Sequence, residues 1–350
     1  MKSILIVFSL SILYSCGSSQ NSSNTGSSSS SKAKEDKLDV TSYAETITAE
    51  ELKEYLFTFA GDDFEGRDTG EPGQKKAAEF LKNQYKRMNI PSPIGDDDYF
   101  QVIPESYFRG GIKSSENVLA YIKGSEKPDE IVVLSAHYDH VGVDSKGNVY
   151  NGADDDGSGT VSLLEIAEAF AKAAKDGQGP KRSILFLHVT GEEKGLYGSK
   201  YYTENPIFSL ENTITNLNID MIGRIDKDHE GEDKSDYIYL IGSDRLSTEL
   251  HNLSEEANTK YTKLNLDYTY NAKDDPNRFY YRSDHYNFAK HNIPIIFYFN
   301  GVHEDYHQIT DTPDKIEYDL MTKRAKLVFY TAWEVANREK RLVVDGIGSE

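Results

Sequence analysis

The sequence predicts an α/β fold, in which a mixed and mostly parallel central sheet is covered by helices on both faces to give three layers. Segments that read as strands alternate with segments that read as helices, which is typical of this class. Most of the strand segments are continuous apolar runs, as expected when both faces of a sheet are covered. They are residues 117–122, 131–136, 183–189, 215–219, 237–241 and 294–299.

The helices are predicted from apolar residues that recur on one helical face. Thr48 and Glu51 have the spacing of a capping box, so the first helix is expected to begin there. Residues 63–73 read as a loop that leads into the second helix. The other predicted helices cover residues 74–89, 158–175 and roughly 318–338.

The folded part is predicted to be one α/β domain over residues 43–341. The 350-residue chain is 37% hydrophobic and 11% aromatic, which is enough for a packed core. Residues 17–42 are largely Ser-rich and are predicted to form a disordered tether. Residues 342–350 are predicted to form a loose tail.

Residues 1–16, MKSILIVFSLSILYSC, resemble a bacterial lipoprotein signal segment. Lys2 supplies a positive start, and the apolar run that follows is too short to be a good membrane span. Cys16 is the single cysteine of the chain, which excludes an internal disulfide, and it lies where a lipoprotein is cleaved and lipidated. We therefore expect an exported protein of the bacterial cell envelope that is anchored through Cys16. A plain secretory signal with an incidental cysteine is the alternative.

The formal net charge of the chain is −19. Such a surface repels phosphates, so no nucleic-acid partner is expected. Contact with a membrane is expected only through the lipid anchor at Cys16. The acidity says little about the substrate, because solubility alone can explain it.

Ionisable side chains follow several predicted strands at the point where each strand ends. HYDH (137–140), TGEE (190–193) and Asp220 each come directly after an apolar strand, and NGVHEDYHQITDT (300–312) follows the last one. NGADDDGSG (151–159) leads into a predicted helix. Ligands of open α/β sheets bind beyond the carboxyl ends of the strands, so these groups are expected to converge on one site.

Three adjacent carboxylates, Asp154, Asp155 and Asp156, repel one another unless something positive lies beside them. Mixed His and carboxylate ligands suit zinc or a related borderline cation, and two metal ions need more carboxylate than one. A bound pair of dications would convert the repulsion into attraction. The residues therefore favour a metal site.

Taken together, these motifs resemble those of the co-catalytic di-zinc exopeptidases, the family of bacterial secreted aminopeptidases and glutamate carboxypeptidase. The motifs are SAHYDHVG, NGADDDGSG, GEEKGLYGS, NIDMIG, SDHYNF and DYHQITDT, and the resemblance runs from about Leu56 to Ile316. It implies a zinc exopeptidase-like fold, two zinc ions per chain and peptide substrates.

The resemblance also implies a role for each matched position. Asp155 would bridge the two zinc ions, with a cis peptide bond between it and Asp156. Glu192 would be the general base that takes a proton from a water held by both zinc ions. Tyr306 would donate a hydrogen bond to the reacting oxyanion. The implied metal ligands are His137, Asp155, Glu193, Asp220 and His307.

Other ionisable residues are expected to support these ligands. Asp139 is expected to orient the imidazole of His137. Asp154 and Asp156 are expected to have structural roles and not to bind metal, and His140 is expected at most to contact a ligand. The roles of Arg282, Asp284, His285 and His303 stay open between contact with the site and structural hydrogen bonding.

The expected function is that of a secreted zinc aminopeptidase, which hydrolyses N-terminal peptide bonds. One alternative is a single-zinc glutaminyl cyclase-like acyltransferase, although that branch lacks the ligand equivalent to His137. A carboxypeptidase or dipeptidase is a second alternative, and residues 267–281 are the expected source of a specificity loop. A non-catalytic peptide-binding lipoprotein is a third, but it would be expected to lack Glu192 or a ligand.

Overall fold

The computed structural model describes residues 40–346, apart from residue 96 and residues 232–233. The predicted signal segment, with Cys16, and the tether as far as residue 39 lie outside this part of the chain. In the described part, no helix combines the length and apolar character needed to cross a membrane.

The central layer is a sheet with the strand order β1-β2-β4-β3-β5-β8-β6-β7. Strands β4, β3, β5 and β8 run parallel to one another, and antiparallel pairs join β1 to β2, β2 to β4 and β8 to β6. The strands are β1 (Phe100–Ile103), β2 (Ser115–Ile122), β3 (Lys127–His137), β4 (Arg182–Val189), β5 (Thr213–Ile219), β6 (Tyr237–Ile241), β7 (Asn265–Asp267) and β8 (Ile295–Phe299). The predicted mixed α/β sheet is confirmed, and each of the six predicted strands is present.

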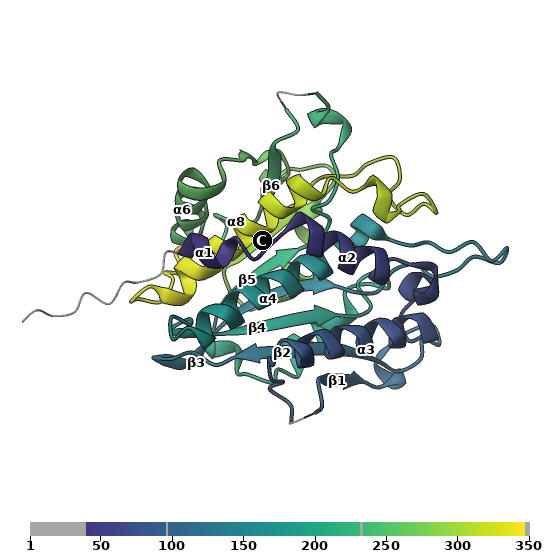
Figure 1. Ribbon diagram of the computed structural model, residues 1–350, viewed down its shortest axis with the longest axis horizontal. Helices are drawn as coiled ribbons and strands as arrows, with labels where there is room; N and C mark the ends of the chain where they lie inside the picture. The colour runs from purple at the N-terminus through teal and green to yellow at the C-terminus, as the bar shows by residue number, and fades with distance from the viewer. Residues whose placement is uncertain (1–39, 96, 232–233, 347–350) are drawn as a thin grey trace, which may run out of the picture. The chain divides into compact units, whose positions relative to one another are not determined.

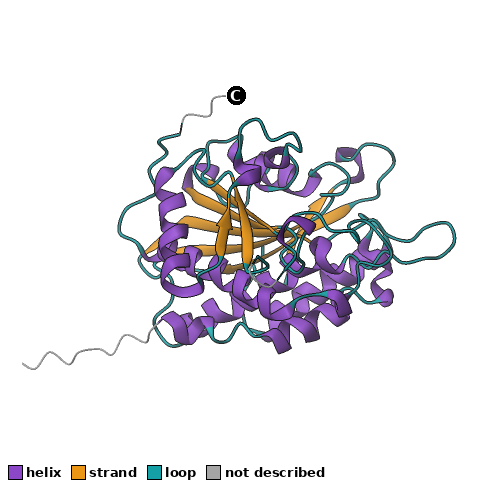
Figure 2. Ribbon diagram, turned by 90° about the horizontal axis from the view of Figure 1, so that it is seen from above, coloured by secondary structure: helices purple, strands orange, loops and turns teal. Residues whose placement is uncertain are grey.

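Helices cover both faces of the sheet, so the predicted three layers are confirmed (Figure 2). Figure 1 shows α3, α4 and α8 across one face. On that side Leu134 and Phe186 of the sheet pack in one core cluster with Phe170 of α4. On the other side Val133 belongs to a second cluster with residues of α5 and α7. Alternate residues of a strand point to opposite faces, which is why continuous apolar runs were needed here.

The helices begin and end close to their predicted bounds where those were given. The helices are α1 (Val40–Ala44), α2 (Ala49–Phe59), α3 (Pro72–Arg87), α4 (Gly159–Lys175), α5 (Tyr197–Glu204), α6 (Thr248–Ala257), α7 (His285–Ala289) and α8 (Tyr318–Asn337). The Thr48 hydroxyl accepts a hydrogen bond from the backbone N of Glu51 (3.2 Å), as the capping box predicted. Helix α3 begins two residues earlier than predicted because Pro72 favours the first turn of a helix.

The prediction of a disordered tether is wrong for residues 40–42, which belong to helix α1. Val40 and Tyr43 of this helix are buried. The Tyr43 ring stacks on Trp333 of α8, with ring centroids 5.7 Å apart. Burial of these apolar side chains stabilises the helix.

The prediction of a loose tail is wrong for residues 342–346. Leu342 is buried in the main core cluster. The Asp345 carboxylate accepts a hydrogen bond from the backbone N of Thr248 (2.9 Å), the first residue of α6, and Gly346 N donates to the Leu246 carbonyl (3.2 Å). The segment therefore packs beside the start of α6, and its carboxylate satisfies a free N–H group of that helix.

Candidate metal centre

The loop before α4 places Asp155 in the interior, where 3% of its surface is exposed. The backbone N atoms of Asp154 and Asp155 donate hydrogen bonds to the Asp311 carboxylate (3.0–3.2 Å). The peptide bond between Asp155 and Asp156 is cis, as the resemblance implied. Asp156 accepts hydrogen bonds from the backbone N of His137 and of Met221 (3.1 and 3.0 Å), so it has the structural role predicted for it.

One oxygen of Asp155 faces a first group of possible metal ligands. Its Oδ1 lies 3.2 Å from Nε2 of His137, the last residue of β3. The same Nε2 lies 3.6 Å from Oδ1 of Asp220, which follows β5. The other ring nitrogen of His137 contacts the Asp139 carbonyl oxygen (3.1 Å), which leaves Nε2 directed at the two carboxylates.

The second oxygen of Asp155 faces another group. Its Oδ2 lies 2.9 Å from Nε2 of His307, which in turn lies 3.1 Å from Oε1 of Glu193. Nδ1 of His140 is 3.0 Å from the same Glu193 oxygen. The structure thus brings together all five predicted ligands, and it adds His140, for which the sequence had predicted only a contact with a ligand.

The residues present fit a pair of zinc ions. Ligand atoms at about 2.0–2.2 Å from a tetrahedral zinc ion are about 3.3–3.6 Å apart, close to the separations above. Burial lowers the pKa of His307, but contact with Asp155 and Glu193 outweighs it and raises that pKa to about 10. The pKa of His137 is likewise raised well above its usual value, against the effect of burial, by Asp220 and its other carboxylate neighbours. Both groups of carboxylates therefore attract positive charge, which dications would supply.

The predicted general base, Glu192, lies in the loop after β4 beside these groups. Glu192 lines a small cavity of about 30 Å³ with Asp155, Asp220 and Tyr306. Burial, together with the neighbouring carboxylates, raises its pKa well above the usual value of a glutamate. Cations bound to those carboxylates would lower this pKa again.

Asp139 contacts the His137 ring, as predicted, but mainly through its backbone. Its carbonyl oxygen lies 3.1 Å from Nδ1 of His137, whereas its carboxylate lies 3.8 Å from that atom. The carboxylate instead accepts hydrogen bonds from the backbone N of Glu192 (3.2 Å) and from the Thr69 hydroxyl (2.8 Å). Asp139 therefore links the His137 loop to the Glu192 loop.

Tyr306 and His307 lie on the loop after β8 with their rings stacked, at a centroid distance of 4.0 Å. Asp305 anchors this loop through ion pairs with Arg224 (2.9 Å) and Lys315 (2.6 Å). Tyr306 lines the same cavity as Glu192, as expected of a group that contacts the substrate.

The segment RSDHYNF contributes a residue that the sequence did not single out. The Ser283 hydroxyl donates a hydrogen bond to Oδ2 of Asp220 (2.6 Å) and so orients that predicted ligand. Asp284 is fully buried, accepts a hydrogen bond from Ser199, and has its pKa raised to about 7 by burial. Nε2 of His285 contacts the Tyr280 carbonyl (2.8 Å). Asp284 and His285 are thus held by structural contacts.

His303 and Arg282 are the other two residues whose roles the sequence left open. Nε2 of His303 lies 3.1 Å from Oδ2 of Asp154, so this histidine supports the aspartate loop. Arg282 lines the small cavity, and its guanidinium lies over the Phe279 ring at 4.8 Å from the centroid.

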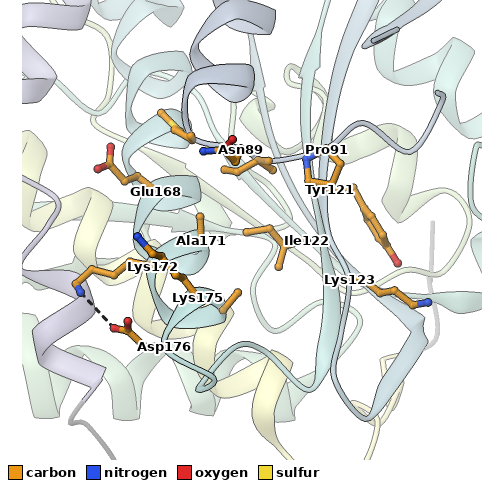
Figure 3. Close-up of a pocket in the computed structure, with 13 residues that line it drawn as sticks. Asn89, Pro91, Tyr121, Ile122, Lys123, Glu168, Ala171, Lys172, Lys175 and Asp176 are labelled. Carbon is orange, nitrogen blue, oxygen red and sulfur yellow. Dashed lines mark hydrogen bonds and ion pairs between the residues drawn. The ribbon is translucent and has the colours of Figure 1, made fainter. Parts of the chain in front are cut away.

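A larger cavity of about 700 Å³ lies elsewhere, between the end of α3, β2 and the second half of α4 (Figure 3). Its lining includes the Lys172–Asp176 ion pair.

Comparison with known proteins assigns the chain to a family. The model of "Peptidase family M28" matches residues 117–332. The chain belongs to peptidase family M28. The predicted resemblance to co-catalytic zinc exopeptidases is confirmed at this level, since the match includes all the predicted ligands.

Among curated relatives, a probable leucine aminopeptidase of Arthroderma otae is 30% identical over 299 residues, which are 76% of this chain and 78% of that protein. A probable zinc metalloprotease of Pyricularia oryzae is 28% identical over 258 residues, which are 63% of this chain and 50% of that protein. The chain thus spans about half the length, or less, of the first curated relatives it matches.

Solved structures show the same fold. The LapA aminopeptidase of Legionella pneumophila matches with a TM-score of 0.67 and 21% identity, over 86% of this chain and 74% of that one. A glutaminyl cyclase of Bacteroides thetaiotaomicron matches with a TM-score of 0.63 and 18% identity, over 82% of this chain and 98% of that one. One fold therefore serves two kinds of reaction, and the side chains of the site must distinguish them.

Proposed function

We propose that this M28 chain is a zinc-dependent exopeptidase, an aminopeptidase that hydrolyses N-terminal peptide bonds with two zinc ions and Glu192 as general base. The observation that supports it most is the position of Asp155. One of its oxygens lies 3.2 Å from His137 and the other lies 2.9 Å from His307. A carboxylate shared in this way suits two neighbouring cations, one on each side.

Zinc bound at these two groups would supply Lewis acidity, which polarises a substrate carbonyl and lowers the pKa of water. Glu192 accepts the proton of the attacking water and later gives a proton to the leaving amine. Burial and the neighbouring carboxylates raise the pKa of Glu192, which suits a group that takes up a proton and later returns it. Burial and nearby carboxylates also raise the pKa of Tyr306, so its hydroxyl keeps the proton that it donates to the oxyanion.

The cavity beside Glu192 supports an aminopeptidase among the M28 activities. Much of its lining is apolar and comes from Met221, Phe279, Phe297 and Phe299. Three carboxylates, of Asp155, Glu192 and Asp220, also line it and outnumber the one cation of the lining, Arg282, so the cavity attracts a free ammonium group. This lining favours a substrate with a free N-terminus and an apolar first side chain, and most of that substrate must lie outside the void of about 30 Å³. The probable leucine aminopeptidase relative agrees with this preference.

The proposal is tested with a panel of chromogenic peptides. The panel contains free aminoacyl substrates (Leu, Phe, Lys, Glu), the same substrates with a blocked N-terminus, and an N-terminal glutaminyl peptide. We expect cleavage of the free Leu and Phe substrates, loss of that activity with a chelator, and recovery when zinc is restored. Metal analysis of the purified protein is expected to give two zinc ions per chain.

Three outcomes would contradict this function. Cleavage of blocked peptides alone would point to an endopeptidase or a carboxypeptidase. Cyclisation of the glutaminyl peptide by a chain with one zinc ion would indicate the cyclase reaction instead. Turnover that is unaffected by the chelator at full metal removal would exclude a zinc-dependent reaction.

We also propose that the mature chain is a lipoprotein of the bacterial cell envelope, anchored through Cys16. The apolar run, Lys2 and the single cysteine after LYS support this location. Mass spectrometry of the N-terminal peptide, after expression in a bacterium, is expected to find an acylated Cys16. An uncleaved chain, or cleavage at another residue with an unmodified Cys16, would contradict it.

A further inference from the structure

His140 is a fully buried imidazole that lacks the usual hydrogen bonds. Its exposed fraction is 0%, and within the described part of the chain neither ring nitrogen has a hydrogen-bond partner. Buried polar groups are nearly always hydrogen-bonded, and an unpaired one costs about 1–3 kcal/mol. A structural histidine would be expected to avoid this cost. The ring therefore needs a partner of another kind.

The surroundings of His140 indicate what that partner is. Its Nδ1 lies 3.0 Å from Oε1 of Glu193 and 3.7 Å from Oδ2 of Asp155. The shorter distance is within hydrogen-bonding range, yet the direction at the ring nitrogen is not that of a hydrogen bond. The same two carboxylate oxygens are buried and also lack hydrogen-bond partners among the residues that the structure describes. Atoms that bind one cation behave in this way, because their lone pairs point to a common centre.

His307 completes the group from the other side. Its Nε2 is 2.9 Å from the Asp155 oxygen and 3.1 Å from the Glu193 oxygen, and its ring is inclined at 76° to that of His140. Four of the six pairs among these three atoms and Nδ1 of His140 are 2.9–3.7 Å apart, and ligand atoms of His140, Asp155 and Glu193 all lie within 4.8 Å of one another. Four ligands around a tetrahedral zinc ion would be about 3.3–3.6 Å apart.

We propose that His140 binds a metal ion through Nδ1, so that one of the two zinc sites has four protein ligands: His140, Asp155, Glu193 and His307. This inference rests on the proposed function for the presence of zinc. The other group offers three residues, His137, Asp155 and Asp220. A zinc ion with four protein ligands is expected to be held more tightly than one with three, and it can still take a water as a fifth ligand. The two sites would therefore differ in affinity, with the four-ligand site the tighter one.

Two contacts hold the His140 residue in position, one at its backbone and one at its ring. The backbone N of His140 donates a hydrogen bond to the Arg67 carbonyl (3.1 Å). The ring packs directly on Gly152, where a Cβ atom would lie 2.5 Å from the His140 Cγ. Gly152 also has a φ of +55°, which glycine adopts more readily than other residues. The glycine of the NGADDD segment therefore leaves room for the imidazole beside Asp155.

The experiment compares the parent protein with His140→Ala and His140→Gln, and with His291→Ala as a control at an exposed histidine. Zinc content is measured at a series of free zinc concentrations set by a chelator buffer, and the absorption spectrum is recorded with Co²⁺ in place of zinc. The parent and the control are expected to bind two ions, one more tightly than the other. Both His140 variants are expected to lose at least about tenfold in affinity at the tighter site, with a changed Co²⁺ spectrum.

Unchanged affinity and spectrum in both His140 variants would overturn the proposal. A weaker tight site with an unchanged Co²⁺ spectrum would also overturn it, since His140 would then only orient Glu193. His140→Gln keeps a polar side chain of similar size, and circular dichroism shows whether each variant is folded. The measurements need no turnover, so a chain that binds two ions through His140 but cleaves no peptide would refute the proposed function alone.

Discussion

Replacement of Glu192 by Gln is expected to lower kcat by about 10²–10⁴-fold, the usual contribution of a general base. The amide has nearly the shape of the carboxylate but cannot accept the proton of the attacking water. Zinc content is expected to stay the same, because Glu192 is not among the predicted ligands, and KM is expected to change little. The measurement is steady-state kinetics on the best substrate of the panel, beside metal analysis of the same preparation.

The matched control is Glu256→Gln on α6, far in sequence from every predicted ligand. Its side chain is exposed, and the substitution is chemically the same. This variant is expected to keep the kcat of the parent within about twofold, since exposed substitutions of this kind have small effects. A Glu192→Gln protein with both zinc ions and the parent kcat would show that another group accepts the proton.

The strands and the place where the ligands gather could be predicted from sequence for the same physical reason, whereas the identity of each ligand was implied by the family resemblance. A strand with two covered faces is a continuous apolar run, and polar side chains can reach solvent or a ligand only where the run ends. His137 and Asp220 lie at such ends, so strand and ligand were found together. Strands β1 and β7 were missed because they are short and lie at the edges of the sheet, where no such run is required.

The supporting roles of His140, Ser283 and Asp311 could not be predicted, because they depend on contacts between distant segments. His140 follows a ligand by three residues, but only the fold shows its ring against Gly152 and Glu193. Ser283 is adjacent to Asp284, and the sequence drew attention to the more acidic neighbour. Asp311 holds the loop of Asp155 from a segment more than 150 residues away. Nothing local in the sequence distinguishes these residues from ordinary loop residues.

One buried residue connects several of these contacts. Arg67, in the EGRDTG segment, is fully buried and its guanidinium donates hydrogen bonds to four backbone carbonyls. They belong to Phe59, Tyr138, Asn151 and Gly152, at 2.6–3.2 Å. Burial lowers its pKa to about 10, so the side chain is still charged at neutral pH. Arg67 therefore fixes the two loops that hold His137, His140 and Asp155.

Replacement of Arg67 by Met is expected to cost about 3–5 kcal/mol of the free energy of unfolding, the range seen when a buried charged network is broken. The methionine fills much of the space but removes the guanidinium donor of four carbonyls. Among the residues that the structure describes, only the Gly152 carbonyl keeps another donor, Gly157 N (3.2 Å). Each carbonyl left without a donor that water cannot reach costs about 1–3 kcal/mol. The measurement is urea unfolding at a fixed free zinc concentration, repeated with a chelator, because bound zinc also stabilises the folded state. Arg109→Met, at an exposed arginine, is the control and is expected to stay within about 0.5 kcal/mol of the parent.

The Arg67→Met variant also shows whether Arg67 affects zinc binding as well as the free energy of unfolding. Since the Arg67 backbone also accepts the hydrogen bond of His140 N, movement of this segment is expected to weaken zinc binding together with stability. The loss of stability should persist with the chelator, because the carbonyl contacts do not involve zinc. A variant within 1 kcal/mol of the parent under both conditions would mean that water replaces the guanidinium. The loops at the metal centre would then be held by Asp156 and Asp311 without Arg67.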